Sequence, residues 1–242
     1  MDNFSESIER LIELGGALEK PEVMTIKGRT YITKPVRDMT DPTPETLSVS
    51  TLTALVDYLK TNVDTLDPSQ LLIQVEGPAR VSVLSKLTEE FAQRDVYIAA
   101  EPLLPVYRFD SWMTTDKFVP MLQATFQPKG HRDELLRLAS GVRIEASADI
   151  KDDGLTQHVT ARNGVARMEQ VEIPNPCALY PFSTFLEVEQ PERLFVFRMR
   201  HADAEVACTL IDADGGAWKQ DAAVAVRDYL RKELGDGFAI IA

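Results

Sequence analysis

The sequence has few of the residues that cross-link a chain or anchor it in a membrane. Among its 242 residues are only two cysteines, Cys177 and Cys208, so reduced thiols and no disulfide framework are expected. No apolar run approaches the roughly 20 residues that span a bilayer. The first residues lack the basic start and apolar stretch of a signal peptide. We therefore expect a cytoplasmic protein with no membrane partner.

Basic residues are also scarce. The chain has 26 Lys and Arg against 38 Asp and Glu, a formal net charge of −12. A protein that binds duplex nucleic acid needs a basic face to displace phosphate counterions, so direct duplex binding is not expected. The acidic residues are spread along the chain, which also disfavours a carboxylate array that mimics DNA. Solubility is the simplest consequence of this charge.

Motifs that carry chemistry are missing as well. The sequence contains no glycine-rich phosphate loop, no G-x-S-x-G elbow, and no H-E-x-x-H or C-x-x-C pattern. The histidines, His131, His158 and His201, are far apart in sequence, so no metal site is predicted. Cys177 and Cys208 lie among apolar residues and are predicted to be small core residues. The sequence therefore predicts neither an enzyme nor a bound cofactor.

The segment Asp212-Ala-Asp-Gly-Gly216 resembles the start of a calcium-binding loop. Gly216 stands where the third ligand belongs, and Ala223 stands where a twelve-residue loop needs its glutamate. A turn before a helix is the favoured interpretation.

The first 40 residues predict a small N-terminal segment. Apolar residues at helical spacing predict a helix over about 4–14, and two β-prone runs around Lys-Gly-Arg predict a hairpin over 22–33. A stretch rich in Pro, Thr and Asp (37–48) follows and is typical of a linker. We therefore expect residues 1–40 to precede a main domain, 48–242.

The first half of the main domain, 48–140, is predicted to be rich in helices with a small sheet. Helices are expected at 48–63, with a serine cap, at 114–126 and at 131–140, and a strand–turn–strand unit at 71–87. Residues 95–109 are β-prone but interrupted by Pro102 and Pro105, which favours an edge strand or an exit loop. Pro120 fits the second helix only if it lies in the opening turn.

From residue 142 the period changes to that of strands. Apolar and polar residues alternate over 142–150, and Asp-Asp-Gly (152–154) and Asn-Gly (163–164) mark turns. Up to six antiparallel strands are expected between 142 and 212, one of them over 182–190. A helix over 217–234 and a strand near the end complete 142–242. The predicted class is α+β: an α-rich N-terminal half with a small sheet, then an antiparallel meander with a C-terminal helix.

Residues 152–179 concentrate side chains of catalytic type. His158 and Arg162 share the polar face of a predicted strand, and Asp153 sits in the turn before it. Nothing in the segment supplies a nucleophile with its base or ligands at metal spacing. A solvated hairpin is favoured, with a site assembled from His158, Asp153 and Arg162 as the alternative.

Two further groups are candidate ligand contacts. Tyr180, Phe182 and Phe185 have the character needed to stack a nucleotide base, although burial in the core is the more ordinary explanation. Arginines are the second group, because they would line an anion pocket if their strands adjoin, or else pair with Glu187 and Glu189 across an exposed sheet face. These arginines are Arg80, Arg193, Arg198 and Arg200.

The order of segments resembles a known family. "STLTALVDYLK", "RDVYIAAEPLLP", a helix ending "LQATF", "DDGLTQHVTARNGVA", "IPNPCALYPFSTFLEVEQPERLFVFRMR" and "DADGGAWK" are similar to an uncharacterised family of tailed phages and prophages that includes the YfdQ-like proteins. The resemblance covers roughly residues 48–242. It implies a phage or prophage accessory protein made in the cytoplasm of the bacterial host, and it supplies no catalytic residue.

The leading hypothesis is a non-enzymatic accessory protein that acts as a homo-oligomer, because the edges of a long antiparallel sheet must be paired or covered. A closed shell is one form that such an assembly can take. The alternative is a binding protein that sequesters a small nucleotide-like ligand or a phage or host protein. Its candidate ligand contacts are Tyr180, Phe182, Phe185, Arg193, Arg198, Arg200, His158 and Arg162.

Overall fold

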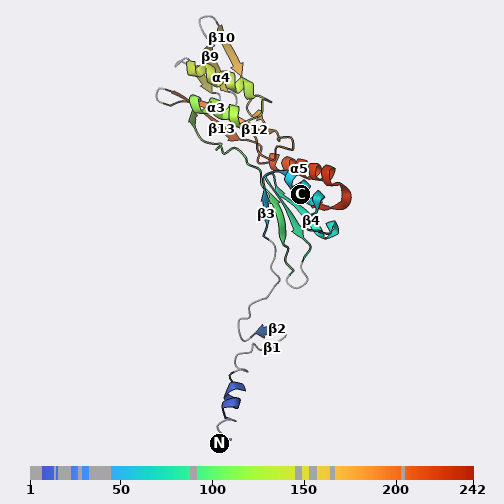
Figure 1. Cartoon of the computed structure of the whole chain (residues 1–242). Helices are drawn as coiled ribbons and strands as arrows, with labels where there is room; N and C mark the ends of the chain where they lie inside the picture. Colours follow the sequence, from blue (N-terminus) through green and yellow to red (C-terminus); the bar gives the residue numbers. More distant parts are fainter. Residues whose placement is uncertain are drawn as a thin grey trace. The chain divides into compact units, whose positions relative to one another are not determined.

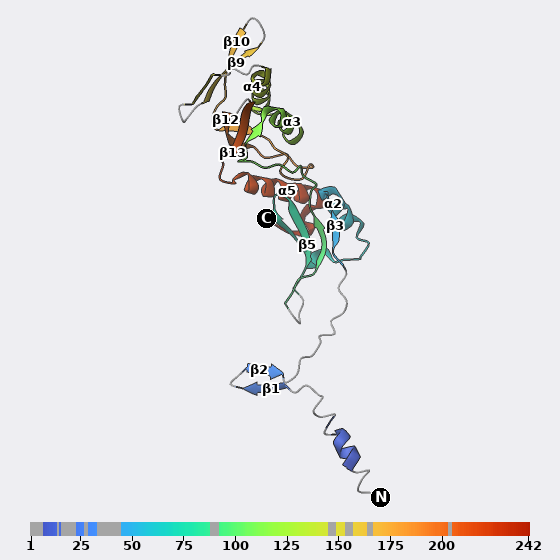
Figure 2. The same cartoon turned by 90° about the vertical axis from the view of Figure 1, so that its left-hand side faces the viewer.

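The computed structural model describes residues 7–13, 15, 23–26, 29–32, 45–87, 92–144, 149–152, 157–163, 167–202 and 205–242. Contacts within the chain define an N-terminal unit, Met1–Thr43, and a main unit, Pro44–Ala242. The main unit combines helices with mainly antiparallel sheets and has a C-terminal helix (Figures 1 and 2). The predicted α+β class is therefore confirmed.

The N-terminal unit contains a short helix and a hairpin. Residues 7–13 are helical, and strands β1 (Val23–Ile26) and β2 (Arg29–Ile32) pair antiparallel. The hairpin prediction is confirmed, and the helix prediction is confirmed for the described residues; residues 4–6 and 14 of the predicted helix lie outside them. Of the predicted linker, residues 37–44 lie outside the described residues.

A five-stranded sheet forms the first layer of the main unit, in the order β14-β4-β5-β6-β3. Its strands are β3 (Leu47–Val49), β4 (Leu71–Gly77), β5 (Arg80–Ser85), β6 (Val96–Ala100) and β14 (Ala239–Ile241). Strands β4, β5 and β6 are antiparallel, whereas β3 and β14 join in parallel. Of the two alternatives predicted for residues 95–109, the edge strand is wrong, because β6 pairs with both β5 and β3, whereas the exit loop is confirmed for the residues after β6. Pro102 and Pro105 follow the strand, in the irregular segment that leaves the sheet.

Two helices pack on one face of this sheet. Helix α2 (Leu52–Thr61) begins after Thr51, whose Oγ1 accepts a hydrogen bond from the backbone N–H of Ala54 at 3.1 Å. The cap is therefore this threonine and not a serine. Helix α5 (Trp218–Leu234) packs against β4. The helices bury residues at helical spacing in a shared core: Leu52, Leu55, Val56 and Leu59 of α2, and Ala222, Val226 and Leu230 of α5.

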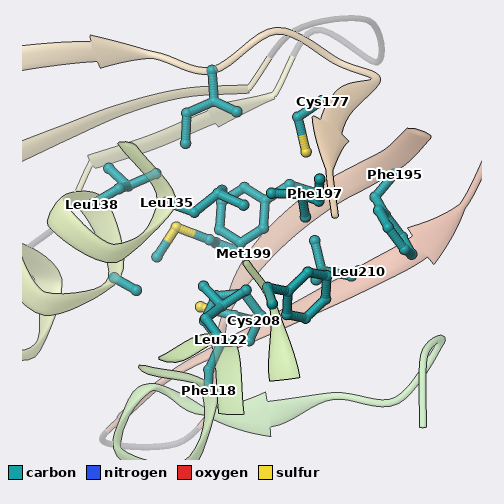
Figure 3. Packing of buried hydrophobic residues seen from close by; sticks show 14 of the residues in the cluster. Phe118, Leu122, Leu135, Leu138, Cys177, Phe195, Phe197, Met199, Cys208 and Leu210 are labelled. Carbon is teal, nitrogen blue, oxygen red and sulfur yellow. The ribbon is translucent and has the colours of Figure 1, made fainter. Parts of the chain in front are cut away.

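A four-stranded antiparallel sheet carries the second core. Its order is β11-β12-β13-β7, with β7 at Met113–Thr114, β11 at Cys177–Leu179, β12 at Arg193–Ala202 and β13 at Glu205–Asp212. Helices α3 (Thr115–Thr125) and α4 (Arg132–Ile144) pack against it. Figure 3 shows Phe118 and Leu122 of α3 meeting Phe197 and Met199 of β12 among the buried side chains.

The remaining strands form a separate three-stranded sheet. Strands β8 (Asp149–Asp152), β9 (Gln157–Asn163) and β10 (Arg167–Glu172) pair antiparallel in the order β10-β9-β8. Apart from the strand predicted over 182–190, the predicted antiparallel strands are present, but they are divided between two sheets. The predicted strand start at 142 is wrong, because α4 continues to Ile144. Residues 153–156 and 164–166, where the turns were predicted, lie outside the described residues.

Two other local predictions need correction. Pro120 lies in the interior of α3, not in its opening turn. A proline there cannot donate the backbone hydrogen bond of a helix. The burial of the nearby Phe118, Leu122 and Phe126 in the second core offsets this loss. Residues 182–190 form a loop instead of a strand. Within the described ranges, no helix is both long and apolar enough to span a membrane.

Candidate functional site

Arg193 is the centre of a buried polar cluster in the main unit. Although arginine is seldom buried, only 5% of this residue is exposed. Its guanidinium carbon lies 4.3 Å from the ring centroid of Trp218, 4.8 Å from that of Phe109 and 5.1 Å from that of Phe195. One of its terminal nitrogens donates to the carboxylate of Asp212. The charge is therefore neutralised and enclosed by aromatic rings.

Tyr107 and Ser183 extend this cluster. The Ser183 hydroxyl lies 3.3 Å from the Tyr107 hydroxyl and 3.4 Å from Arg193 Nη1. The Tyr107 hydroxyl also donates to the carbonyl of Phe182 at 3.3 Å. Burial raises the pKa of Tyr107. Tyr107 therefore stays protonated at neutral pH and serves as a hydrogen-bond donor.

Buried Gln190 fixes the loop that carries Ser183. Its side-chain oxygen accepts from the backbone N–H groups of Ser183 at 2.8 Å and Thr184 at 3.1 Å, and its nitrogen donates to the carbonyl of Phe185 at 3.0 Å. These bonds satisfy backbone groups that would otherwise be buried without partners. The side chain of Gln190 thus supplies backbone hydrogen bonds of the kind that an adjacent strand would supply.

The cluster does not have the arrangement of a catalytic site. Besides Tyr107 and Arg193, Ser183 Oγ contacts only a backbone carbonyl, that of Pro181, among its described hydrogen bonds. None of these groups is a general base at neutral pH, so the hydroxyl is not activated as a nucleophile. The arrangement instead connects β12, the start of α5 and the 101–109 segment.

The three candidate aromatic residues have different surroundings. Phe185 is completely buried in the core under α2 and α5, which excludes stacking on a ligand. Phe182 is half-buried, and its backbone N–H donates to Thr125. Tyr180 donates to Glu192 at 2.6 Å, and this hydrogen bond raises the pKa of Tyr180. Burial and local pairing therefore account for most of this aromatic segment.

The candidate arginines do not gather in one pocket. Arg193 points into the core with Phe195, whereas Arg198 and Arg200 alternate onto the opposite face of β12. Arg200 is exposed, and its guanidinium carbon lies 4.3 Å from the ring centroid of Trp112. The half-buried Arg198 donates to the carbonyl of Phe197 at 3.3 Å. Since these side chains diverge, an anion pocket that combines them is not formed.

The glutamates predicted to pair with these arginines have other partners. Glu187 accepts from the backbone N–H of Thr53 at 3.1 Å, and Glu189 lies 2.9 Å from Lys129 Nζ. Arg80 begins β5 of the five-stranded sheet and pairs with Glu76 of the adjacent strand β4 and with Glu101, which follows β6.

His158 and Arg162 lie on β9, the central strand of the three-stranded sheet. His158 is opposite Glu172 on one side and Lys151 on the other, and Arg162 is opposite Met168. Asp153, the third residue of the alternative catalytic hypothesis, lies outside the described residues.

The two cysteines are core residues, and the Asp-rich segment is a turn before a helix, as the sequence predicts. Cys177 and Cys208 are completely buried, and burial raises the pKa of each thiol to about 12. Asp214 Oδ1 accepts from the backbone N–H of Gly216 at 2.7 Å, which closes the turn before α5. Across the residues that the structure describes, no group of three metal-ligating side chains is assembled.

The N-terminal unit has a different kind of candidate site, an exposed apolar surface. In the described part of this unit, every residue with an assigned exposure is exposed. Ile12 is 69% exposed and Val23 is 68% exposed. The large apolar side chains concerned are Ile8, Leu11 and Ile12 of the helix and Val23, Met24, Ile26, Tyr31 and Ile32 of the hairpin. We call the second group the hairpin surface.

Sequence reasoning missed both the arginine cluster and the significance of the hairpin surface. The partners of Arg193 come from segments far apart in the chain, and no spacing rule connects them. The exposure of the hairpin could not be read from its pattern, because apolar residues on both faces are also typical of a buried strand. No protein-family model, curated protein or solved structure matches the chain.

Proposed function

We propose that the protein acts by assembling with copies of itself, as a non-enzymatic accessory protein, and that the N-terminal unit takes part in the contact. The observation that carries this proposal is the hairpin surface, together with the exposed apolar side chains of the preceding helix. Isolated two-stranded hairpins and helices of about seven residues are marginally stable in water. Both elements gain stability when their apolar side chains are covered.

A second copy of the chain is the simplest partner for the hairpin surface, because no other kind of protein is needed to cover it. In the described part of the chain, β1 and β2 pair only with each other, so the outer edge of each strand can pair with the identical edge of a second copy. A two-fold contact of this kind uses the same surface twice. The resemblance to phage and prophage proteins supports a role in the bacterial host cytoplasm, where phage proteins are synthesised in many copies.

The alternative of nucleotide sequestration loses several of its proposed contacts. Phe185 is buried, and the charge of Arg193 is neutralised by Asp212 beneath three aromatic rings. Arg198 and Arg200 remain on another face of the sheet. Assembly therefore agrees better with the geometry than ligand capture does.

Native mass spectrometry of the full chain over a range of concentrations tests the proposal. A discrete multiple of 27.0 kDa without added mass is the expected result. A monomer at every concentration would contradict assembly, and a monomer carrying a reproducible small-molecule adduct would favour sequestration instead.

A further inference from the structure

Among the described residues the strands of the N-terminal hairpin pair only with each other, and their outer edges differ in their residues. Strand β1 has the sequence Val-Met-Thr-Ile and carries no charge, whereas β2 begins with Arg29. Charged residues on a strand discourage pairing at its edge. From this difference, and from the exposure of the hairpin surface, we infer that two copies of the chain join through their β1 edges into a four-stranded antiparallel sheet. The inference specifies one contact of the proposed assembly and rests on that proposal.

The pairing within the hairpin determines which backbone groups of β1 face outward. Ile26 and Arg29 enclose a two-residue loop, so they are the first hydrogen-bonded pair. Since hydrogen-bonded and non-hydrogen-bonded pairs alternate, Met24 and Tyr31 form the next bonded pair. The N–H and C=O groups of Val23 and Thr25 therefore point to the open edge.

This geometry selects one register for the contact between copies. When Met24 of each copy lies on the two-fold axis, Val23 of one copy is opposite Thr25 of the other. All outward N–H and C=O groups of these residues are then paired, since each such pair exchanges two hydrogen bonds. A two-fold axis perpendicular to the sheet also keeps equivalent faces on the same side.

The register produces a continuous apolar row on one face. Tyr31 is directly opposite Met24 within each hairpin, so the row across the four strands is Tyr31, Met24, Met24 of the second copy and its Tyr31. Ile26 is two residues from Met24 and lies on the same face. Contacts between such cross-strand neighbours are the main source of sheet stability. The hairpin thus gains both edge pairing and side-chain packing.

A cysteine at position 24 tests this register in the full chain. Met24 of the two copies would form a non-hydrogen-bonded pair, with Cα atoms about 4.5 Å apart, which lies within the range that a disulfide bridges. The variant Met24→Cys is expected to form a covalent dimer as its main product under mild oxidation by diamide. The wild-type chain is the background control, because burial protects Cys177 and Cys208.

Tyr31→Cys is the matched comparison. Residue 31 is paired with residue 24 and has a similar exposure, 48% against 40%, but it lies on the other strand. It is expected to remain largely uncross-linked. Equal cross-linking of the two variants, or preferential cross-linking of Tyr31→Cys, would overturn the β1 contact.

Light scattering on the uncross-linked wild-type chain distinguishes a failure of the β1 contact from a failure of the proposed assembly itself. A wild-type oligomer whose Met24→Cys variant does not cross-link would overturn the β1 contact and leave assembly intact. A wild-type monomer at the concentration used for cross-linking would contradict assembly itself.

Discussion

The guanidinium group of Arg193 lies 4.3 Å above the indole ring of Trp218. Arg193 belongs to β12 of the four-stranded sheet, and Trp218 begins α5, which packs on the five-stranded sheet. One buried cation therefore connects elements of the two cores in the main unit. The salt bridge to Asp212 neutralises the cation at this position.

Replacement of Arg193 by methionine is expected to destabilise the main unit by about 3 kcal/mol, because a buried ion pair loses one partner. The loss of stability is expected at the lower end of the range for broken buried ion pairs, because the Asp212 side chain is partly exposed to water. Chemical denaturation followed by circular dichroism measures the change.

Arg200→Met is the control for this substitution. Arg200 is equally close to a tryptophan ring but is exposed, so its loss should cost no more than about 1 kcal/mol. Equal effects of the two substitutions would show that Arg193 has no special structural role.

Gly130 occupies a position that no other residue should tolerate. Its φ is +61°, and a Cβ atom would lie 2.4 Å from the carbonyl oxygen of Ala178. Gly130→Ala is expected to cost about 3 kcal/mol, from the left-handed backbone and the steric overlap together. Thermal or chemical unfolding measures the loss.

Gly215→Ala separates the two contributions. Gly215 has a φ of +64° but no atom within 4 Å of an added Cβ, so only the backbone cost of about 1 kcal/mol is expected. If Gly130→Ala were no more destabilising than Gly215→Ala, the close packing of the 127–131 turn against β11 would be wrong.

The buried thiols should make stability depend on alkaline pH. Burial raises the pKa of Cys177 and Cys208 from 9.0 to about 12, so the unfolded chain releases these protons first. Their contribution to stability is present below pH 9 and is lost as the pH rises towards 12. The free energy of unfolding should therefore be lower at pH 10 than at pH 8.

The variant Cys208→Ala is expected to show a smaller decrease between these pH values than the wild type. Ellman's reagent provides an independent measurement, since both thiols should react only after denaturant is added. Rapid reaction of either thiol in the native protein would contradict their burial.

Local sequence patterns predicted most of the helices and strands. Helix α2 follows from apolar residues three and four apart, and β12 follows from the alternation of Phe195, Phe197 and Met199 with polar residues. The end of α4 was misassigned because Val142 and Ile144 fit both periods over a short window. Such ambiguity is resolved by the three-dimensional packing of the preceding helical turns.

Contacts between distant residues set the limit of the sequence predictions. The 182–190 segment has the aromatic and apolar composition of a strand, but Gln190 supplies the hydrogen bonds that a neighbouring strand would otherwise provide. Tyr107 meets Ser183 across 76 residues of sequence, and no periodicity signals that contact.

The central claim is that copies of the chain assemble through the hairpin surface. Light scattering coupled to size-exclusion chromatography tests it most directly, by comparing the wild-type chain with the double variant Met24→Lys/Tyr31→Lys. Val63→Lys is the control, because Val63 is 72% exposed and lies in the main unit. The account predicts a wild-type oligomer, an unchanged Val63→Lys oligomer, and a shift of the double variant towards the 27.0 kDa monomer. A double variant that assembles as fully as the wild type would contradict the role of the hairpin surface.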